Sequence, residues 1–311
     1  MEFKHIPVML NEVIENLNIK SDGVYVDCTV GGGGHSLEIV KKLKTGHLYA
    51  FDRDEDAIKK SSETLKKYSN KITLIKANYK NAPQILCELG VNKIDGFLID
   101  LGVSSYQIDE GDRGFSFVNN GKLDMRMDRQ ENVLTAEEIV NTFSQEKLAN
   151  IFQIYGEEEF ARPIAKNIVL ARANKRIETT FELRDIIEKS MPKKIVFSRG
   201  GASKKVFQAL RIYINGELDG LDNLLESLVE MLNAGGRGTV LTFHSLEDRI
   251  VKNVFKMDAT DCVCPPKTPI CICGHKASVK LVTKKPIVAT DEEQKQNSRS
   301  TCAKLRVVEK I

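Results

Sequence analysis

The sequence lacks the features of a membrane protein and of an exported one. No stretch reaches the roughly 18 consecutive apolar residues that a transmembrane helix needs. The segment Met1 to His5 lacks the apolar stretch of a secretory signal, so we expect a cytoplasmic protein with no membrane association. Seven cysteines among 311 residues do not make a disulfide scaffold. Without an export signal, thiol or metal chemistry is the preferred interpretation of these cysteines.

The chain also lacks two signatures of nucleotide-binding proteins. It has no Gly-Lys-Ser or Gly-Lys-Thr P-loop, and the cluster Gly31–Gly34 does not have the GxGxxG spacing. Without a P-loop, the chain lacks the lysine that usually binds the phosphates of a nucleotide. The missing GxGxxG spacing weakens the case for a dinucleotide.

Charge of one sign is missing from three separate stretches. The net charge is only +3, but residues 161–177, 189–211 and 262–290 contain basic residues and no acidic one. A solvated surface is the simpler interpretation of any single run. Three such runs together favour a polyanionic partner such as a nucleic acid.

The first hundred residues alternate between strand and helix patterns. Short apolar runs that predict strands are separated by amphipathic or polar segments that predict helices. This alternation indicates βαβ units and a parallel sheet, hence an α/β fold. The predicted strands cover residues 24–28, 47–52, 72–75 and 94–100.

The alternation breaks after residue 103 and resumes near residue 218. Residues 103–130 predict an ordered loop, and two capping-box patterns, at Thr135 and Thr179, predict helices beyond it. A leucine-rich helix over 218–232 is expected to end at the glycines of 234–238. Strands are expected at 238–243 and 303–308. We therefore predict a discontinuous α/β domain, residues 1–105 and 206–311, interrupted by a mainly helical domain, residues 106–205.

Conspicuous residues lie at the ends of the predicted strands. Gly31–Gly34 follow the first strand, Asp52 ends the second, Tyr79 follows the third and Asp100 ends the fourth. Ligands of open α/β sheets bind at this edge, and an acid about twenty residues after the glycines can hold ribose hydroxyls. Helix capping is the alternative for each acid alone. Together they favour a nucleoside-type ligand, for which S-adenosyl-L-methionine fits at least as well as NAD.

Seven blocks spread over the chain carry a closer resemblance. In order and spacing they are similar to those of the RsmH (MraW) family, and they cover nearly the whole chain. The blocks are Gly31–Ser36, Asp100–Ser105, Arg113–Phe117, Leu123–Asp128, Tyr155–Glu158, Phe207–Ile212 and Phe243–Arg249.

The resemblance implies a class I, Rossmann-like methyltransferase fold with a mostly parallel sheet and an inserted helical domain. It implies methylation of N4 of a cytidine in 16S ribosomal RNA, with S-adenosyl-L-methionine as cofactor and 16S rRNA or the small ribosomal subunit as partner. It leaves monomer and dimer both open. The cofactor contacts that it implies are Gly33, Gly34, His35, Asp52, Tyr79, Asp100 and Gln107.

Residues for catalysis and for RNA binding follow from this interpretation. Cytosine N4 shares its lone pair with the ring, so an acceptor for its N–H bond would help, and Asp100 is the candidate; a role only in cofactor binding is the alternative. His244 either orients RNA or caps a helix. The RNA backbone contacts that we expect, all basic, are Arg199, Lys204, Lys205 and Arg211.

Four cysteines form two Cys-x-Cys pairs near the end of the chain. Cys262, Cys264, Cys271 and Cys273 have ligand types that suit zinc, although the spacing is tighter than the usual Cys-x₂-Cys. A reduced surface loop is the alternative, and the sequence assigns no metal.

Two other functions compete with methyl transfer. One is a non-catalytic RNA-binding factor in ribosome assembly. The other is an NAD-dependent oxidoreductase, which the absent GxGxxG pattern disfavours.

Overall fold

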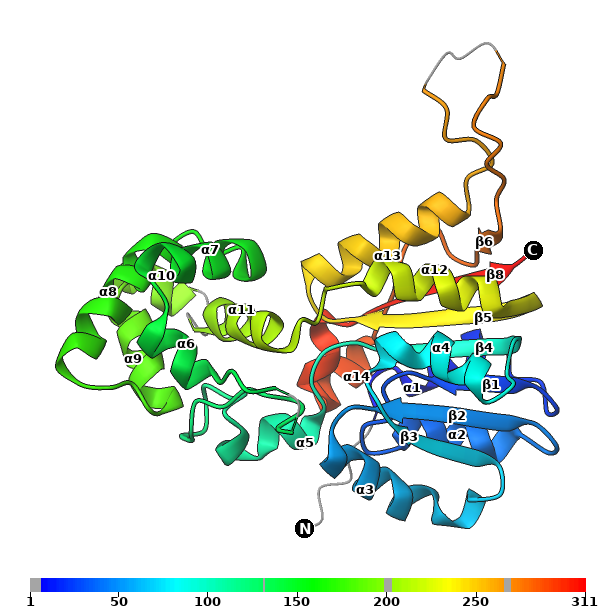
Figure 1. Ribbon diagram of the computed structural model, residues 1–311, viewed down its shortest axis with the longest axis horizontal. Helices are drawn as coiled ribbons and strands as arrows, with labels where there is room; N and C mark the ends of the chain where they lie inside the picture. Colours follow the sequence, from blue (N-terminus) through cyan, green and yellow to red (C-terminus); the bar gives the residue numbers. More distant parts are fainter. Residues whose placement is uncertain (1–6, 131, 199–202, 266–269) are drawn as a thin grey trace. The chain divides into compact units, whose positions relative to one another are not determined.

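The computed structural model describes residues 7–130, 132–198, 203–265 and 270–311. The chain divides into two compact units, shown in Figure 1. One comprises Met1–Gly102 and Leu218–Ile311 and is called the sheet unit; the other, Val103–Glu217, is called the helical unit. Among the described residues, no helix combines the length and apolar character needed to span a membrane.

The sheet unit is built on one mixed sheet in the order β3-β2-β1-β4-β5-β8-β6, with β7 also paired to β8. The five strands from β3 to β5 are parallel, and β8 runs antiparallel to β5. This confirms the predicted α/β fold with a mostly parallel sheet. The strands are β1 (Val24–Asp27), β2 (His47–Asp52), β3 (Ile72–Lys76), β4 (Ile94–Asp100), β5 (Leu232–Thr242), β6 (Val279–Leu281), β7 (Ile287–Val288) and β8 (Lys304–Lys310).

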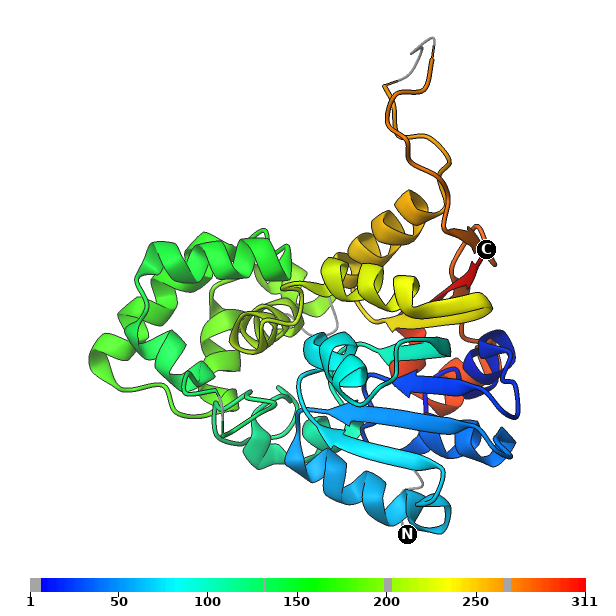
Figure 2. The ribbon, with the colours of Figure 1, turned by 45° about the vertical axis from the view of Figure 1, so that its right-hand side comes forward.

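Helices cover both faces of this sheet, as Figures 1 and 2 show. Successive side chains of a strand point to opposite faces. In β4, Phe97 and Ile99 pack with α4, α12 and α13, whereas Leu98 packs with α1 and α2. The helices are α1 (Leu10–Leu17), α2 (Gly34–Lys42), α3 (Glu55–Leu65), α4 (Ala82–Glu88), α12 (Leu221–Met231), α13 (Ser245–Asp258) and α14 (Asp291–Gln296); short 3₁₀ turns are η1 (Lys66–Tyr68), η2 (Tyr79–Asn81) and η4 (Ser298–Cys302).

The glycines of 234–238 do not end a helix, so that prediction was wrong. Helix α12 ends at Met231, and the glycines lie within β5. They allow β5 to approach β4 closely: a Cβ on Gly238 would lie 2.2 Å from the Phe97 ring, and one on Gly236 would lie 2.9 Å from the Asp95 carbonyl oxygen. The glycine pattern therefore reflects strand packing rather than a helix cap.

The helical unit has its own apolar core, and its elements begin where the capping boxes predict. Thr135 and Glu138 cap α6 reciprocally, as Thr179 and Glu182 cap α9. The predicted loop over 103–130 contains two short helical segments, α5 and η3. The elements are α5 (Ser105–Asp109), η3 (Gly111–Arg113), α6 (Ala136–Thr142), α7 (Gln145–Gly156), α8 (Ala161–Asn174), α9 (Thr180–Lys189), α10 (Lys193–Ser198) and α11 (Lys204–Asn215).

The helical unit is longer than predicted at both ends, 103–217 instead of 106–205. Helix α11 accounts for most of the difference. Its apolar residues Val206, Phe207 and Leu210 are buried in the core of the helical unit. A Cβ on Gly156 of α7 would lie 2.6 Å from the carbonyl oxygen of Lys205, so the two helices approach closely there. This packing was not readable from periodicity alone.

Candidate active site

Three carboxylic acids end three neighbouring strands of the sheet unit. Asp27 ends β1, Asp52 ends β2 and Asp100 ends β4. Because these strands are adjacent and parallel, their carboxyl ends meet at one edge. The order of the sheet reverses between β1 and β4, which is where open α/β sheets bind ligands.

The glycine turn joins β1 to α2 at the same edge. Gly33 has φ of 83° and precedes the first residue of α2, a backbone conformation that glycine adopts without strain. A Cβ built on Gly32 would meet no described atom within 4 Å. The turn therefore leaves space beside the backbone at the start of the helix, where unpaired N–H groups favour electronegative atoms of a ligand.

Asp52 is fixed by the backbone around it. Its Oδ2 accepts a hydrogen bond from Gly31 N–H and its Oδ1 accepts one from Asp54 N–H, both at 2.9 Å. Burial raises the pKa of Asp52 to about 6 although these two hydrogen bonds oppose the shift. Each carboxylate oxygen has a further lone pair, so the group can still accept from two ligand hydroxyls.

Asp27 is a site residue that sequence reasoning did not assign. Its side chain is 1% exposed, and it accepts from Ser36 Oγ at 2.7 Å and from Thr29 N–H at 3.0 Å. Burial raises its pKa to about 6. The hydroxyl of Thr29 in turn accepts from Asp100 N–H at 2.7 Å. The only signal was an acid at the end of the strand that precedes the glycines.

Asp100 has the most perturbed carboxyl of the three. Burial, reinforced by the negative charges of Asp27 and Glu247, raises its pKa to about 8. Its Oδ1 is buried and has no hydrogen-bond partner among the described residues. At neutral pH the group is therefore mostly protonated, and it retains capacity for a partner that the described protein atoms do not supply.

His35 is positioned next to Asp100. Its Nε2 lies 3.0 Å from the Val8 carbonyl oxygen, which can only accept, so Nε2 carries the proton. Its Nδ1 lies 3.8 Å from Asp100 Oδ2. The residue is 6% exposed and belongs to α2, which places it on the sheet edge with the glycine turn.

The other two predicted cofactor contacts lie in different units. Tyr79 begins η2 immediately after β3 and is half-buried against the core on one face of the sheet. Gln107 lies in α5 of the helical unit, 4% exposed, and its Oε1 accepts from Ser104 N–H at 3.0 Å. Contact of either residue with a cofactor stays a prediction.

The predicted RNA contacts differ in whether their basic side chains already bind other groups of the protein. Lys204 is exposed on α11. Lys205 donates to the Glu157 carbonyl oxygen at 2.8 Å, and Arg211, 16% exposed, makes two 2.8 Å hydrogen bonds to Glu217. Arg199 lies outside the described residues.

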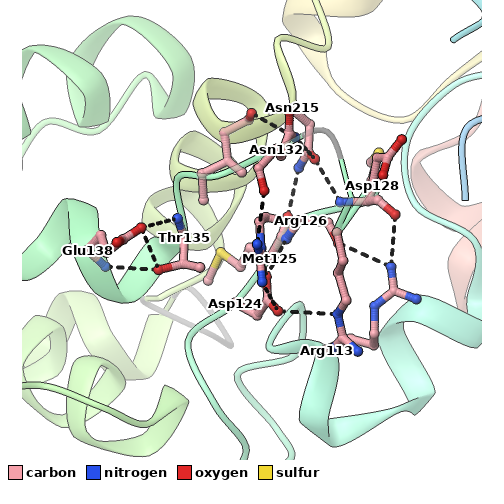
Figure 3. Close-up of polar contacts among 12 residues, drawn as sticks. Arg113, Asp124, Met125, Arg126, Asp128, Asn132, Thr135, Glu138 and Asn215 are labelled. Atoms are coloured by element: carbon pink, nitrogen blue, oxygen red, sulfur yellow. Dashed lines mark hydrogen bonds and ion pairs between the residues drawn. The ribbon is translucent and has the colours of Figure 1, made fainter.

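The block from Leu123 to Asp128 forms a polar network in the helical unit, shown in Figure 3. Arg126 pairs with both oxygens of Asp124, and Arg113 donates to the carbonyl oxygens of Arg126 and Met127. Asn215 of α11 donates to Met125 O at 2.8 Å. These contacts give the block a structural role.

His244 caps helix α13, which confirms the second of its two interpretations. Its Nδ1 accepts from Glu247 N–H at 3.4 Å, and Glu247 Oε2 accepts from Phe243 N–H at 2.9 Å. Glu247 is 1% exposed and its charge contributes to the raised pKa of Asp100. The sequence pattern gave no reason to connect this helix-capping acid with the site.

The sheet order, the glycine turn and the acids at the strand ends are those of a Rossmann-like methyltransferase. A family model agrees: the MraW methylase family matches residues 2–311, and the chain belongs to this family.

Sequence similarity to known proteins extends over the whole chain. "Ribosomal RNA small subunit methyltransferase H" of Finegoldia magna is 51% identical, with 100% of both chains covered. The protein of the same name from Clostridium botulinum strain Loch Maree is 53% identical, again with 100% of both covered. A solved rRNA methylase structure from Streptococcus thermophilus is 12% identical, with TM-score 0.41 and coverage of 97% of this chain and 93% of that one.

These findings settle the class of activity. The predicted family and the predicted methyltransferase activity are confirmed, together with S-adenosyl-L-methionine as the methyl donor. The NAD-dependent oxidoreductase is thereby excluded as the family function.

Proposed function

We propose that this protein methylates N4 of one cytidine in 16S ribosomal RNA and that it acts in the cytoplasm. The substrate class follows the names of relatives that share about half of its residues over their whole length. The observation that supports N4 chemistry is the buried Oδ1 of Asp100, which has no hydrogen-bond partner among the described residues. Such an oxygen is suited to accept an N–H bond from a substrate amine.

The residues at the strand ends fit the methyl donor. Asp52 would hold the ribose hydroxyls, and the backbone at Gly33 and Gly34 would face the methionine part. The Tyr79 ring would pack on the adenine, while His35 and Gln107 would lie toward the amino-acid end. A sulfonium cation suits a site with three carboxyl groups of raised pKa.

Asp100 would act on the amine rather than on the donor. Cytosine N4 is a weak nucleophile because its lone pair is delocalised into the ring. A positive charge nearby lowers the pKa of Asp100, since it favours the ionised carboxylate. The carboxylate then accepts an N4–H bond and returns electron density to nitrogen. Alignment of N4 with the methyl group supplies much of the remaining acceleration.

RNA binding would use the basic residues of the helical unit. Lys204 is the exposed candidate, and Lys205, Arg211 and Arg199 remain further candidates. Their contacts to phosphates would make affinity fall steeply with salt. The target cytidine must leave its stack to reach the strand ends, as in other enzymes that modify bases.

Mass spectrometry of 16S rRNA tests the proposal. Cells without the protein should lack one methyl group on one cytidine, and the wild-type gene should restore it. The purified Asp100→Asn variant should lose at least about 100-fold in turnover while its affinity for S-adenosyl-L-methionine changes far less. Unchanged rRNA methylation would refute the substrate. RNA binding without methyl transfer in every condition would favour the non-catalytic assembly factor.

A further inference from the structure

An arm of the sheet unit leaves the end of α13 and returns at β6. Its described residues are 259–265 and 270–278, and Figures 1 and 2 show them extending beyond the helix. At its base, Ser278 N–H donates to the Asp258 carbonyl oxygen at 2.8 Å. The methyltransferase site uses no residue of this arm.

The four cysteines of the arm come together. Cys262 and Cys264 are on the outgoing segment, and Cys271 and Cys273 are on the returning one. All four Sγ atoms lie within 4.8 Å of one another. Cys271 Sγ lies 3.5 Å from Cys262 Sγ, 4.0 Å from Cys264 Sγ and 3.5 Å from Cys273 Sγ, and Cys262 and Cys273 are 3.8 Å apart.

These distances match a tetrahedral metal site. Four thiolates at the usual Zn–S distance of about 2.3 Å have sulfur atoms about 3.8 Å from one another. A disulfide needs about 2.05 Å between sulfur atoms, and all four cysteines are free. The arrangement is therefore that of a four-sulfur cage rather than of two oxidised pairs.

Groups next to the sulfur atoms support a thiolate cage. Ile272 N–H donates to Cys264 Sγ at 3.4 Å, a contact that stabilises negative charge on a metal ligand. Gly274, directly after Cys273, has φ of 62°, which suits glycine at a tight turn. His275 Nε2 instead lies 3.1 Å from the Met257 carbonyl oxygen, so the ligand set is the four cysteines.

The described residues of the arm form no apolar core that could hold the cysteines together. Its described large apolar side chains are exposed: Val263 by 43%, Ile270 by 77% and Ile272 by 83%. Ordering a segment costs conformational entropy that buried apolar area usually offsets. In small segments without an apolar core, metal–thiolate bonds can supply the free energy that offsets this entropy cost.

We propose that Cys262, Cys264, Cys271 and Cys273 bind one Zn²⁺ ion that fixes the arm. With four protein ligands the coordination shell is complete, which leaves no position for water or substrate. The role is therefore structural. This inference does not rest on the proposed RNA substrate.

Metal analysis of the reduced full-length protein tests it. The wild type should carry one zinc per chain, and the double variant Cys262→Ser/Cys273→Ser should carry none. Cys302→Ser is the matched control, because Cys302 is exposed and outside the arm; it should retain one zinc. Replacement of zinc by Co²⁺ should give the visible absorption of a tetrahedral thiolate site.

A second measurement follows the arm itself. A strong chelator should speed tryptic cleavage after the exposed Lys276 at least tenfold in the wild type and should leave the rate in the double variant unchanged. Reduced wild-type protein without stoichiometric metal, or equal zinc in the double variant, overturns the proposal. Metal content and cleavage rate are measured without RNA. Failure of the zinc proposal is therefore distinguishable from failure of the RNA assignment.

Discussion

Replacing Asp100 by asparagine should stabilise the fold much more at alkaline pH than at pH 5. The amide has the shape of the protonated carboxyl group but cannot ionise. In the folded protein the pKa of Asp100 is about 8, because of burial and of the charges of Asp27 and Glu247. In an unfolded chain an aspartate has a pKa of about 3.9.

The sign follows from the raised pKa. Between the two pKa values the folded protein keeps a proton that the unfolded chain releases. The stabilising contribution is therefore complete below about pH 4, falls as pH rises and levels off above about pH 8. At about 1.36 kcal/mol per pH unit, the loss between pH 5 and pH 9 is at most about 4 kcal/mol. Because 27% of the Asp100 side chain is exposed, water screens part of this, and we expect about 2–4 kcal/mol.

Urea unfolding of both proteins at pH 5, 6, 7, 8 and 9 measures the difference. The advantage of Asp100→Asn should grow with pH across this range. Parallel stability curves for the two proteins would refute the assignment of a neutral carboxyl group at Asp100.

Asp95→Asn, on the same strand, is the matched control. Burial pushes the pKa of Asp95 upward, but hydrogen bonds from Val24 N–H, Asn233 and Lys20 outweigh it and hold the pKa below its usual value. A lowered pKa gives stability that is lost only as pH falls below about 4. The effect of Asp95→Asn should therefore be constant between pH 5 and pH 9.

Three further predictions follow from the described contacts. Asp52→Asn should weaken S-adenosyl-L-methionine binding about 10–100-fold in calorimetry, since a hydrogen bond to a charged group contributes about 1.5–3 kcal/mol; unchanged affinity contradicts the ribose role. Asn215→Ala should cost about 2–4 kcal/mol in urea unfolding because it leaves Met125 O and Met127 N–H unpaired, whereas the exposed Asn174→Ala should stay within about 0.5 kcal/mol. Lys204→Ala should reduce the slope of log affinity for 16S rRNA against log salt by about 1, and an unchanged slope counts against a phosphate contact.

Much of the sheet unit was predictable because its sequence pattern is local. Strand β4 alternates side chains between two cores, and its end at Asp100 is visible as an acid after an apolar run. Because the strands are parallel, Asp52 and Asp100 at their carboxyl ends must lie at the same edge of the sheet. The capping box at Thr135 likewise depends only on residues three positions apart.

The features that were missed depend on contacts between distant residues. Gly238 is needed because the Phe97 ring lies against it, and no local pattern distinguishes this from a helix end. Glu247 has the sequence context of a helix cap, yet its charge raises the pKa of a carboxyl group on another element. Strand β7 has only 2 residues, too short to show a period.

In the proposed chemistry, the raised pKa values of the three acids have a role in binding the cation and in accepting a proton. Three acids at adjacent strand ends destabilise the fold when ionised, and a bound cation compensates for that cost. After methyl transfer the positive charge would lie on N4 instead of on sulfur. At that moment the methylated N4 carries an extra proton and positive charge. Transfer of this proton to the Asp100 carboxylate restores a neutral amine and a neutral carboxyl group.

Calorimetry in buffers of different ionisation enthalpy can detect this cycle. With a pKa of about 8, about 0.9 of the Asp100 carboxyl groups are protonated at pH 7. Binding of S-adenosyl-L-methionine should therefore release close to one proton, whereas binding of its demethylated, uncharged-sulfur product should release far fewer. In Asp100→Asn the two ligands should release equal numbers. Equal release from both ligands in the wild type would mean that the sulfonium charge does not act on Asp100, and the proton acceptor would then have to be sought elsewhere.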